Sequence, residues 1–269
     1  MSRLSFFLLA LLASGTLSYH DLNLKEHHDF CTSELVRRTQ EDVYTNINMT
    51  ANGFNDLLLP LYLNTYRIDK HPEGGTFQPQ VELERQFYYS VASLTPCIRT
   101  ICEIGFNSGS SALIWLLANP TANVVMFDLF THTYSPAGES YLREIKHLNA
   151  TSRLTIIKGS SLETVPAFAK NVSGTGFFCD LLSVDGSHRH EDAVQDIDNM
   201  MALANPQWNA LVVDDTNCGK PYCVDSAIKE HLRRGNIHLV KGISLSGGTR
   251  GVSLLKYSHN HNKTAQIHV

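Results

Sequence analysis

The sequence has no excess of basic charge. Its 22 lysine and arginine residues stand against 26 aspartate and glutamate residues, which gives a formal net charge of -4 over 269 residues. Proteins that bind nucleic acid use clustered lysine and arginine to neutralise the phosphate backbone. The composition therefore argues against nucleic acid as a partner.

Long hydrophobic runs are also lacking after the first residues. A membrane-spanning helix needs about 18 or more apolar residues in succession, and no stretch after Tyr19 approaches that length. Residues 1–19 combine Arg3, an apolar run from Leu4 to Ala13 and a series of small residues, which is typical of a secretory signal peptide. We therefore expect residues 1–18 to be removed and the mature protein to be secreted or to stay in the secretory-pathway lumen, without membrane contact. The alternative, an N-terminal helix packed on the fold, lacks an amphipathic pattern.

Asn-x-Ser/Thr sequons agree with that compartment, because such sites carry glycans in secreted proteins when they lie at the surface. The four sequons are at Asn48, Asn149, Asn171 and Asn262. They predict a glycoprotein.

The six cysteines include no Cys-x-x-Cys pair, which disfavours a structural zinc site. Six cysteines allow 15 pairings into three disulfides. Cys218 and Cys223 enclose a glycine and a proline that favour a turn, so we predict a disulfide between them. A bridge from Cys97 to Cys102 is a weaker hypothesis, because a strand that begins between them would carry their side chains apart.

The chain changes pattern near residue 98. Residues 19–97 show no strong strand pattern and predict a helical N-terminal segment on the substrate side, with one helix near Val81 to Leu94. From residue 98 to 257, short β-rich runs alternate with helical runs, which predicts βαβ units around a parallel sheet. The expected strands are Arg99–Ile104, Val124–Phe127, Leu154–Ile157, Leu181–Val184 and Ala210–Val213, and the expected helices between them are Ser110–Ala118, Gly138–Leu148, Leu162–Ala169 and Glu191–Ala204.

The end of the chain predicts a different connection. A helix near Cys223 to Arg234 precedes two further strands, Ile237–Lys241 and Gly251–Tyr257, joined by a Gly/Ser-rich turn. Because a connection this short must reverse the direction of the chain, we expect the two strands to form an antiparallel hairpin at one edge of the sheet. Residues 258–269 form a polar tail. The predicted fold is a doubly wound α/β fold with a mostly parallel sheet.

Ligands of an open α/β sheet bind beyond the carboxyl ends of its strands. The first strand is followed by Glu103-Ile-Gly-Phe-Asn-Ser-Gly-Ser-Ser111, whose two glycines let the chain turn and bring backbone N–H groups close to a ligand. Their spacing differs from the Gly-x-Gly-x-x-Gly of dinucleotide binders. Asp128 ends the second strand, where a carboxylate can accept hydrogen bonds from ribose hydroxyls, and Ser160 follows the third. Together they predict a nucleoside site.

Acidic residues end the next two strands. Asp185 follows the fourth strand, and Asp214 and Asp215 follow the fifth. Adjacent strands lie about 4.8 Å apart, so these acids can converge on one cation, and oxygen ligands suit Mg²⁺. The alternative is that Asp185 caps the next helix and that the Asp-Asp pair belongs to an ordinary polar loop.

In this order, the motifs resemble those of class I S-adenosylmethionine-dependent methyltransferases, over about residues 98–257. The similarity is to the branch with an Asp-Gly-x-His motif, related to catechol-type and macrolide-sugar O-methyltransferases. The motifs are Glu103-Ile-Gly-Phe-Asn-Ser-Gly-Ser-Ser, Phe127-Asp-Leu, Val184-Asp-Gly-Ser-His188 with Asp196 downstream, and Val213-Asp-Asp215.

The resemblance implies a Rossmann-like sheet of seven strands, S-adenosylmethionine as cofactor and a small-molecule substrate. The positions that it assigns to the cofactor are Glu103, Gly105, Asn107, Gly109, Ser110, Asp128, Ser160 and Asp185. It implies Mg²⁺ at Asp185, Asp214 and Asp215, with Asp185 taking part in catalysis, and His188 as a candidate general base. A histidine at a helix start, bonded to backbone, is the alternative for His188.

We therefore predict a secretory-pathway methyltransferase that methylates an oxygen of a small molecule with Mg²⁺ assistance. The fifth strand ends in Asp-Asp where catechol-type enzymes have Asp-Asn, so their substrate is not carried over. The alternative function is a secreted binding protein that kept the fold and lost catalysis. A third hypothesis, a metal-dependent hydroxylase-like enzyme, would need redox equipment that the sequence does not display. The sequence leaves the methyl acceptor and the oligomeric state open.

Overall fold

The computed structural model describes residues 24–49, 53–70, 72, 81–245 and 250–258. The predicted signal peptide, the sequon at Asn262 and all but the first residue of the predicted tail lie outside these ranges. None of the described helices combines the length and hydrophobicity that a bilayer crossing requires.

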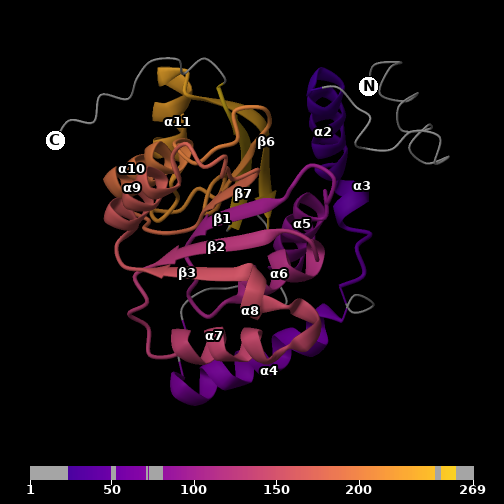
Figure 1. The fold of residues 1–269 in the computed structure, drawn as a ribbon, viewed down its shortest axis with the longest axis vertical. Helices are drawn as coiled ribbons and strands as arrows, with labels where there is room; N and C mark the ends of the chain where they lie inside the picture. Colours follow the sequence, from indigo (N-terminus) through magenta and orange to yellow (C-terminus); the bar gives the residue numbers. More distant parts are fainter. Residues whose placement is uncertain (1–23, 50–52, 71, 73–80, 246–249, 259–269) are drawn as a thin grey trace.

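Seven strands form one sheet in the order β3-β2-β1-β4-β5-β7-β6 (Figure 1). Strands β1 to β5 pair in parallel, whereas β7 runs antiparallel to both of its neighbours, β5 and β6. The strands are β1 (Thr100–Ile104), β2 (Asn123–Asp128), β3 (Leu154–Lys158), β4 (Leu181–Val184), β5 (Ala210–Val213), β6 (Ile237–Leu245) and β7 (Arg250–Tyr257). The predicted fold class and the edge hairpin are confirmed.

Helices connect the parallel strands and cover both faces of the sheet. They are α6 (Ser110–Ala118), α7 (Ser135–Glu144), α8 (Ala150–Arg153), α9 (Ser161–Val172), α10 (His190–Met201) and α11 (Asp225–Arg234), with a 3-10 turn at Lys146–Leu148. The predicted helix over residues 138–148 is in fact two elements, because Ile145 has an extended backbone that ends α7. Pro136 in the first turn explains the earlier start of α7, since proline suits the first helical positions.

Four helices precede the sheet: α2 (Leu24–Arg38), α3 (Glu41–Tyr44), α4 (Phe54–Ile68) and α5 (Glu82–Ala92). The last of these matches the helix predicted over residues 81–94. Helix α5 packs on α6, and α4 packs on α6 and α7. In Figure 1, α4 and α7 lie below β3. The N-terminal segment therefore extends the layer on one face of the sheet.

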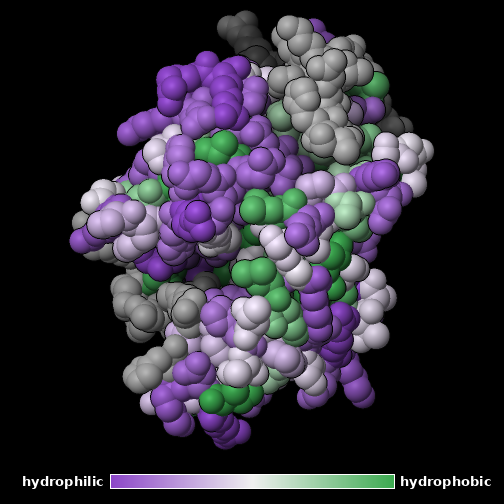
Figure 2. Space-filling model, turned by 90° about the vertical axis from the view of Figure 1, so that its left-hand side faces the viewer, coloured by the Kyte–Doolittle hydropathy of each residue, from purple (hydrophilic) through white to green (hydrophobic). Residues whose placement is uncertain are grey.

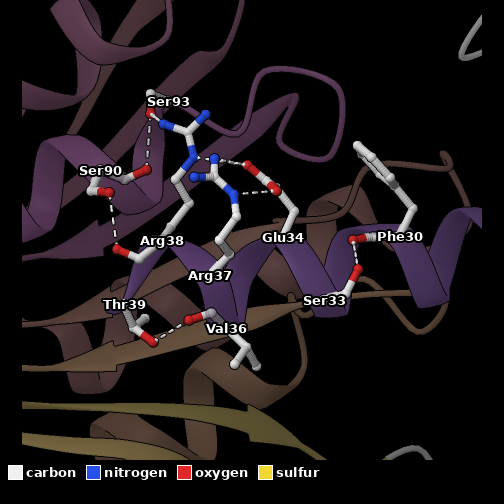
Figure 3. Close-up of polar contacts among 9 residues, drawn as sticks. All are labelled: Phe30, Ser33, Glu34, Val36, Arg37, Arg38, Thr39, Ser90 and Ser93. Carbon is white, nitrogen blue, oxygen red and sulfur yellow. Dashed lines mark hydrogen bonds and ion pairs between the residues drawn. The ribbon is translucent and has the colours of Figure 1, made fainter. Parts of the chain in front are cut away.

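Helix α2 is joined to the C-terminal half of α5 by polar contacts (Figure 3). Arg38 donates from Nη1 to Ser93 Oγ at 2.6 Å, and Ser90 Oγ donates to the Arg38 carbonyl at 3.0 Å. The buried Glu34 accepts from Arg38 Nε at 3.1 Å and also pairs with Arg37. These contacts hold α2 against the outer side of α5.

The two faces of the sheet have separate hydrophobic cores. One contains Phe87 of α5 and Trp115 of α6, and the other contains Val165 of α9, Ile197 of α10 and Ile228 of α11. Full burial of such a side chain stabilises the fold by about 1.5–3 kcal/mol. Burial on both faces keeps the parallel strands, and hence their carboxyl ends, in fixed positions.

Three disulfides use all six cysteines. The predicted bridge Cys218–Cys223 is confirmed, and the others are Cys31–Cys97 and Cys102–Cys179. Strand β1 begins between Cys97 and Cys102, and their side chains belong to opposite cores. The two cysteines therefore pair with different partners, as the strand argument predicts.

Candidate active site

A cavity of about 900 Å³ opens where the parallel strands end. Its walls come from the loops after β1, β2, β3, β4 and β5, together with the first residue of β7. In Figure 1 the arrowheads of β2 and β3 point toward the side of the molecule that Figure 2 presents, where the surface is hollowed. The cavity thus lies where the fold class predicts a ligand.

The loop after β1 depends on glycine at position 105. Gly105 has a φ of +107°, and a Cβ at this position would lie 2.0 Å from the Asp185 carbonyl oxygen. The loops after β1 and β4 therefore touch through their backbones, which no larger residue permits. Gly109 has a φ of +90° at the start of α6, but it packs against Leu142 and Phe106 and does not line the cavity.

Asp128 at the end of β2 holds the same loop. Its Oδ2 accepts hydrogen bonds from the backbone N–H of Phe106 at 2.7 Å and of Asn107 at 3.0 Å, and its Oδ1 accepts from Phe130 N at 2.5 Å. A carboxylate has about four acceptor sites, so the side chain can still receive a ligand hydroxyl. Asp128 lines the cavity as predicted and also shapes it.

Asn107 has a hydrogen-bond acceptor that a ligand could use. Its Oδ1 is buried and has no hydrogen-bond partner among the described residues, and the residue lines the cavity. Buried polar atoms are nearly always paired, so an unpaired oxygen here suits a ligand that brings a donor. Ser110 and Ser160 also line the cavity.

Glu103 is not where the prediction placed it. Its side chain is fully buried behind the cavity wall and accepts from Ser111 Oγ and Trp115 Nε1, each at 2.8 Å, and from Ser183 Oγ at 3.0 Å. Burial, followed by repulsion from Asp185, raises the pKa of Glu103 to about 8. Side chains alternate between the faces of a strand, and Glu103 lies on the face that α6 covers. It joins β1, α6 and β4 instead of lining the cavity.

The three predicted metal ligands converge. Carboxylate oxygens of Asp185, Asp214 and Asp215 lie within 4.8 Å of one another. Asp185 and Asp215 line the main cavity, whereas Asp214 lines a small recess behind it. Arg189 occupies the N-cap position of α10, so Asp185 is not its cap residue.

Crowding changes the acidity of this cluster. Burial, followed by repulsion from Asp215, raises the pKa of Asp185 to about 7. Burial and the neighbouring carboxylates raise the pKa of Asp214 well above its usual range. Acids that repel one another and expose only oxygen atoms fit a hard divalent cation, which would relieve the repulsion.

His188 is paired with a side chain. Its Nε2 lies 2.8 Å from Asp215 Oδ2, and this hydrogen bond is the main reason that the pKa of His188 is raised. Helix α10 begins at His190, so His188 is neither its cap nor its first residue. A carboxylate that orients a half-exposed histidine at a cavity is the arrangement of a general base.

Sequence reasoning missed two residues of this wall and the buried partner of one of them. Arg250, at the start of β7, lines the cavity and donates to the buried Glu84 of α5. Tyr222 lines the cavity with its ring centroid 5.7 Å from that of His188. No local signal identifies the ion pair, because its members are 166 positions apart. The predicted disulfide around Tyr222 is the one signal that could have drawn attention to that loop.

Three of the four sequons can be placed in the structure. The side chains of Asn48, Asn149 and Asn171 are all exposed. Their exposure is compatible with glycosylation, which stays a prediction.

Comparison with known proteins agrees with the fold. Residues 102–216 match the model of a family described as a methyltransferase domain. No curated protein matches this sequence. Residues 102–216 are therefore similar to this methyltransferase family, and the chain has the fold of O-methyltransferases of known structure.

Solved structures show the same fold at low sequence identity. The O-methyltransferase TomG from Streptomyces achromogenes, involved in tomaymycin synthesis and solved in complex with SAM, is 16% identical with a TM-score of 0.57, over 75% of this chain and 89% of that one. An O-methyltransferase from Bacillus cereus in complex with SAH is 13% identical with a TM-score of 0.54, over 76% and 91%. The SAH-bound methyltransferase PaMTH1 from Podospora anserina is 16% identical with a TM-score of 0.56, over 76% and 88%.

Proposed function

We propose that this protein transfers the methyl group of S-adenosylmethionine to a hydroxyl oxygen of a small molecule, with Mg²⁺ assistance, in the secretory pathway. The observation that carries the proposal is the convergence of three carboxylates beside an oriented histidine, at one end of a cavity whose other end is a glycine loop. The O-methyltransferases among the structures with this fold support the choice of oxygen as acceptor.

The cofactor fits the glycine-loop end of the cavity. A volume of about 900 Å³ is sufficient for a cofactor and a small acceptor together. Asp128 would accept from the ribose hydroxyls, the unpaired Asn107 Oδ1 would accept from the ammonium of the methionine part, and Ser160 lies where the adenine would pass. The donor and acceptor pattern of this wall therefore matches a nucleoside with a charged tail.

The acid end would hold the metal and the acceptor. Asp185, Asp214 and Asp215 present the oxygen ligands that Mg²⁺ prefers, and a bound Mg²⁺ lowers the pKa of a hydroxyl on it. His188 would take the hydroxyl proton at Nδ1, the ring nitrogen that does not face Asp215, and Asp215 would stabilise the resulting imidazolium through its contact with Nε2. Placement of the oxygen in line with the methyl group supplies the rest of the rate enhancement.

The proposed compartment rests on separate observations. Three disulfides use every cysteine, and intracellular reducing conditions would not favour them. Expression in a secreting cell is expected to yield a chain that begins at Tyr19 and loses mass on treatment with a glycosidase. Recovery of an intact Met1 without glycans would overturn this part of the proposal.

The activity is tested first by calorimetric titration of the secreted protein with S-adenosylmethionine and S-adenosylhomocysteine, with and without Mg²⁺. Asp128→Ala is expected to weaken cofactor binding by about tenfold or more, because it removes a charged acceptor and loosens the loop. Asp192→Ala is the matched control, since Asp192 lines the same cavity and, among the described residues, its carboxylate contacts the nearby Ser187 and Arg189 and not the loop after β1. A folded protein that binds neither compound would instead be the non-catalytic binding protein.

A further inference from the structure

A buried ion pair lies behind the acid cluster and links it to the N-terminal segment. Glu84 of α5 is only 2% exposed, and its two oxygens accept from Arg250 Nε at 2.7 Å and Nη2 at 3.2 Å. Both residues lie outside residues 102–216, the segment that matches the methyltransferase family. The pair therefore joins two segments that lie on opposite sides of the matched segment in the sequence.

Two acidic side chains, Glu84 and Asp214, lie close to the Arg250 guanidinium. Its Nη2 donates to Glu84 and also lies 3.7 Å from Asp214 Oδ2, which is beyond hydrogen-bond distance but within reach of a small side-chain rotation. Arginine forms its strongest pairs when its planar group meets a carboxylate through two parallel hydrogen bonds. Glu84 has that geometry here, and Asp214 does not.

A second residue of α5 lies near the same cluster. Tyr88 follows Glu84 by one helical turn, so both are on one face of α5. Its hydroxyl is fully buried and has no partner among the described residues, and burial together with the charges of Asp214, Glu84 and Asp185 raises its pKa. Helix α5 thus forms the inner wall of the acid cluster.

We propose that Glu84 is a positioning residue for the metal site. By holding Arg250 in a two-point pair, Glu84 keeps the guanidinium from pairing with Asp214 and leaves that carboxylate available to a divalent cation. Without Glu84, Arg250 would turn to Asp214 and occupy the cluster as an internal cation. This inference rests on the metal site of the proposed function.

The test measures metal affinity directly in the full chain. Mn²⁺ binding followed by electron paramagnetic resonance, and Mg²⁺ binding followed by calorimetry, are compared in the wild type and in variants. Glu84→Gln is expected to weaken binding by about tenfold or more, the range seen when residues that orient metal ligands are replaced. Arg250→Met is expected to strengthen binding, because it removes the competing cation.

Two further variants separate this effect from a general loss of structure. Glu82→Gln removes the same charge from an exposed position on the same helix and is expected to leave metal affinity unchanged. Removing one member of a buried pair can destabilise a protein, whereas removing both is often tolerated. The double variant Glu84→Gln/Arg250→Met is therefore expected to fold and to bind metal nearly as well as the wild type.

The outcomes distinguish the inference from the proposed function. Recovery of affinity in the double variant supports positioning through Arg250. Equal weakness of Glu84→Gln and the double variant would overturn it, as would wild-type affinity in Glu84→Gln. If the wild type binds neither ion, the metal part of the proposed function fails together with this inference.

Discussion

The two ends of the cavity are built in different ways. The cofactor end, formed by residues 105–108, 110 and 111 with Asp128 and Ser160, is made largely of backbone, and the Asp128 carboxylate is bound by backbone N–H groups. The acid end, formed by Asp185, Asp214 and Asp215, is made of side chains that repel one another. The first end is therefore preformed by local geometry, whereas the second is completed by a cation.

The two ends meet at one point, where Gly105 touches the backbone of Asp185. A substitution at that contact should impair both cofactor binding and the acid cluster. A substitution within one end should impair that end alone. The following predictions use this difference, from the largest expected effect to the smallest.

Gly105→Ala is expected to destabilise the fold by about 2–5 kcal/mol and to abolish cofactor binding and turnover. Its new Cβ would meet the Asp185 carbonyl oxygen at 2.0 Å, and the φ of +107° is unfavourable for alanine. Thermal unfolding and titration with S-adenosylhomocysteine measure the two effects. Gly174→Ala is the control, because Gly174 also has a positive φ but has no atom within 4 Å of the new Cβ. Equal stability of the two variants would contradict the proposed contact.

Asp185→Asn is expected to affect only the acid end. We expect the rate of methyl transfer to fall by about a thousandfold, or about 4 kcal/mol, because the metal loses a charged ligand. Titration should show that S-adenosylhomocysteine still binds, since the backbone at position 185 is unchanged. Chelation of divalent ions should reduce the wild-type rate similarly. Full activity in the presence of a chelator would show that no metal is used.

Replacing both cysteines of the loop that carries Tyr222, Cys218→Ser/Cys223→Ser, is expected to lower the free energy of unfolding by about 2 kcal/mol. Because Tyr222 lines the acid end, we also expect weaker binding of the methyl acceptor with unchanged affinity for S-adenosylhomocysteine. A loss of cofactor affinity would show that the two ends are less independent than the geometry indicates.

Asp196→Asn tests a residue between the two ends, since Asp196 accepts from Ser161 Oγ at 2.7 Å and lies close to Gly186. Burial raises the pKa of Asp196 from 3.8 to about 6. The folded state therefore holds this proton more tightly than the unfolded state, and stability falls as the pH rises from about 4 to 6 and stays reduced above it. We expect the variant to be more stable than the wild type by about 2 kcal/mol at pH 7, with a smaller difference at pH 4. Denaturant unfolding at both values measures this, and a difference independent of pH would contradict it.

Local sequence patterns were sufficient to predict many of the strands and helices. Strands β4 and β5 and helix α6 have the predicted bounds, because short β-rich runs and the helical run after the glycine loop are local signals. The boundaries that differed include Ile145, where helix and turn compete, and the end of β6, which runs to Leu245 instead of Lys241.

The candidate site was only partly predictable. Acids at neighbouring strand ends converge because the sheet order places β1, β4 and β5 side by side. The orientation of Glu103 away from the cavity was missed, since a motif gives a position along the strand but not the face on which the side chain lies.

By itself, the sequence determined the alternation of strands and helices, the turns that require glycine, the acids at the strand ends and the short-range disulfide Cys218–Cys223. Each depends on neighbouring residues, whose backbone preferences and spacing are visible in the chain. Only the tertiary structure decided the partners of Cys31 and Cys102, the burial of Glu103 and the pairing of Glu84 with Arg250. These contacts join segments far apart in the chain, and packing of the helices on the sheet brings them together.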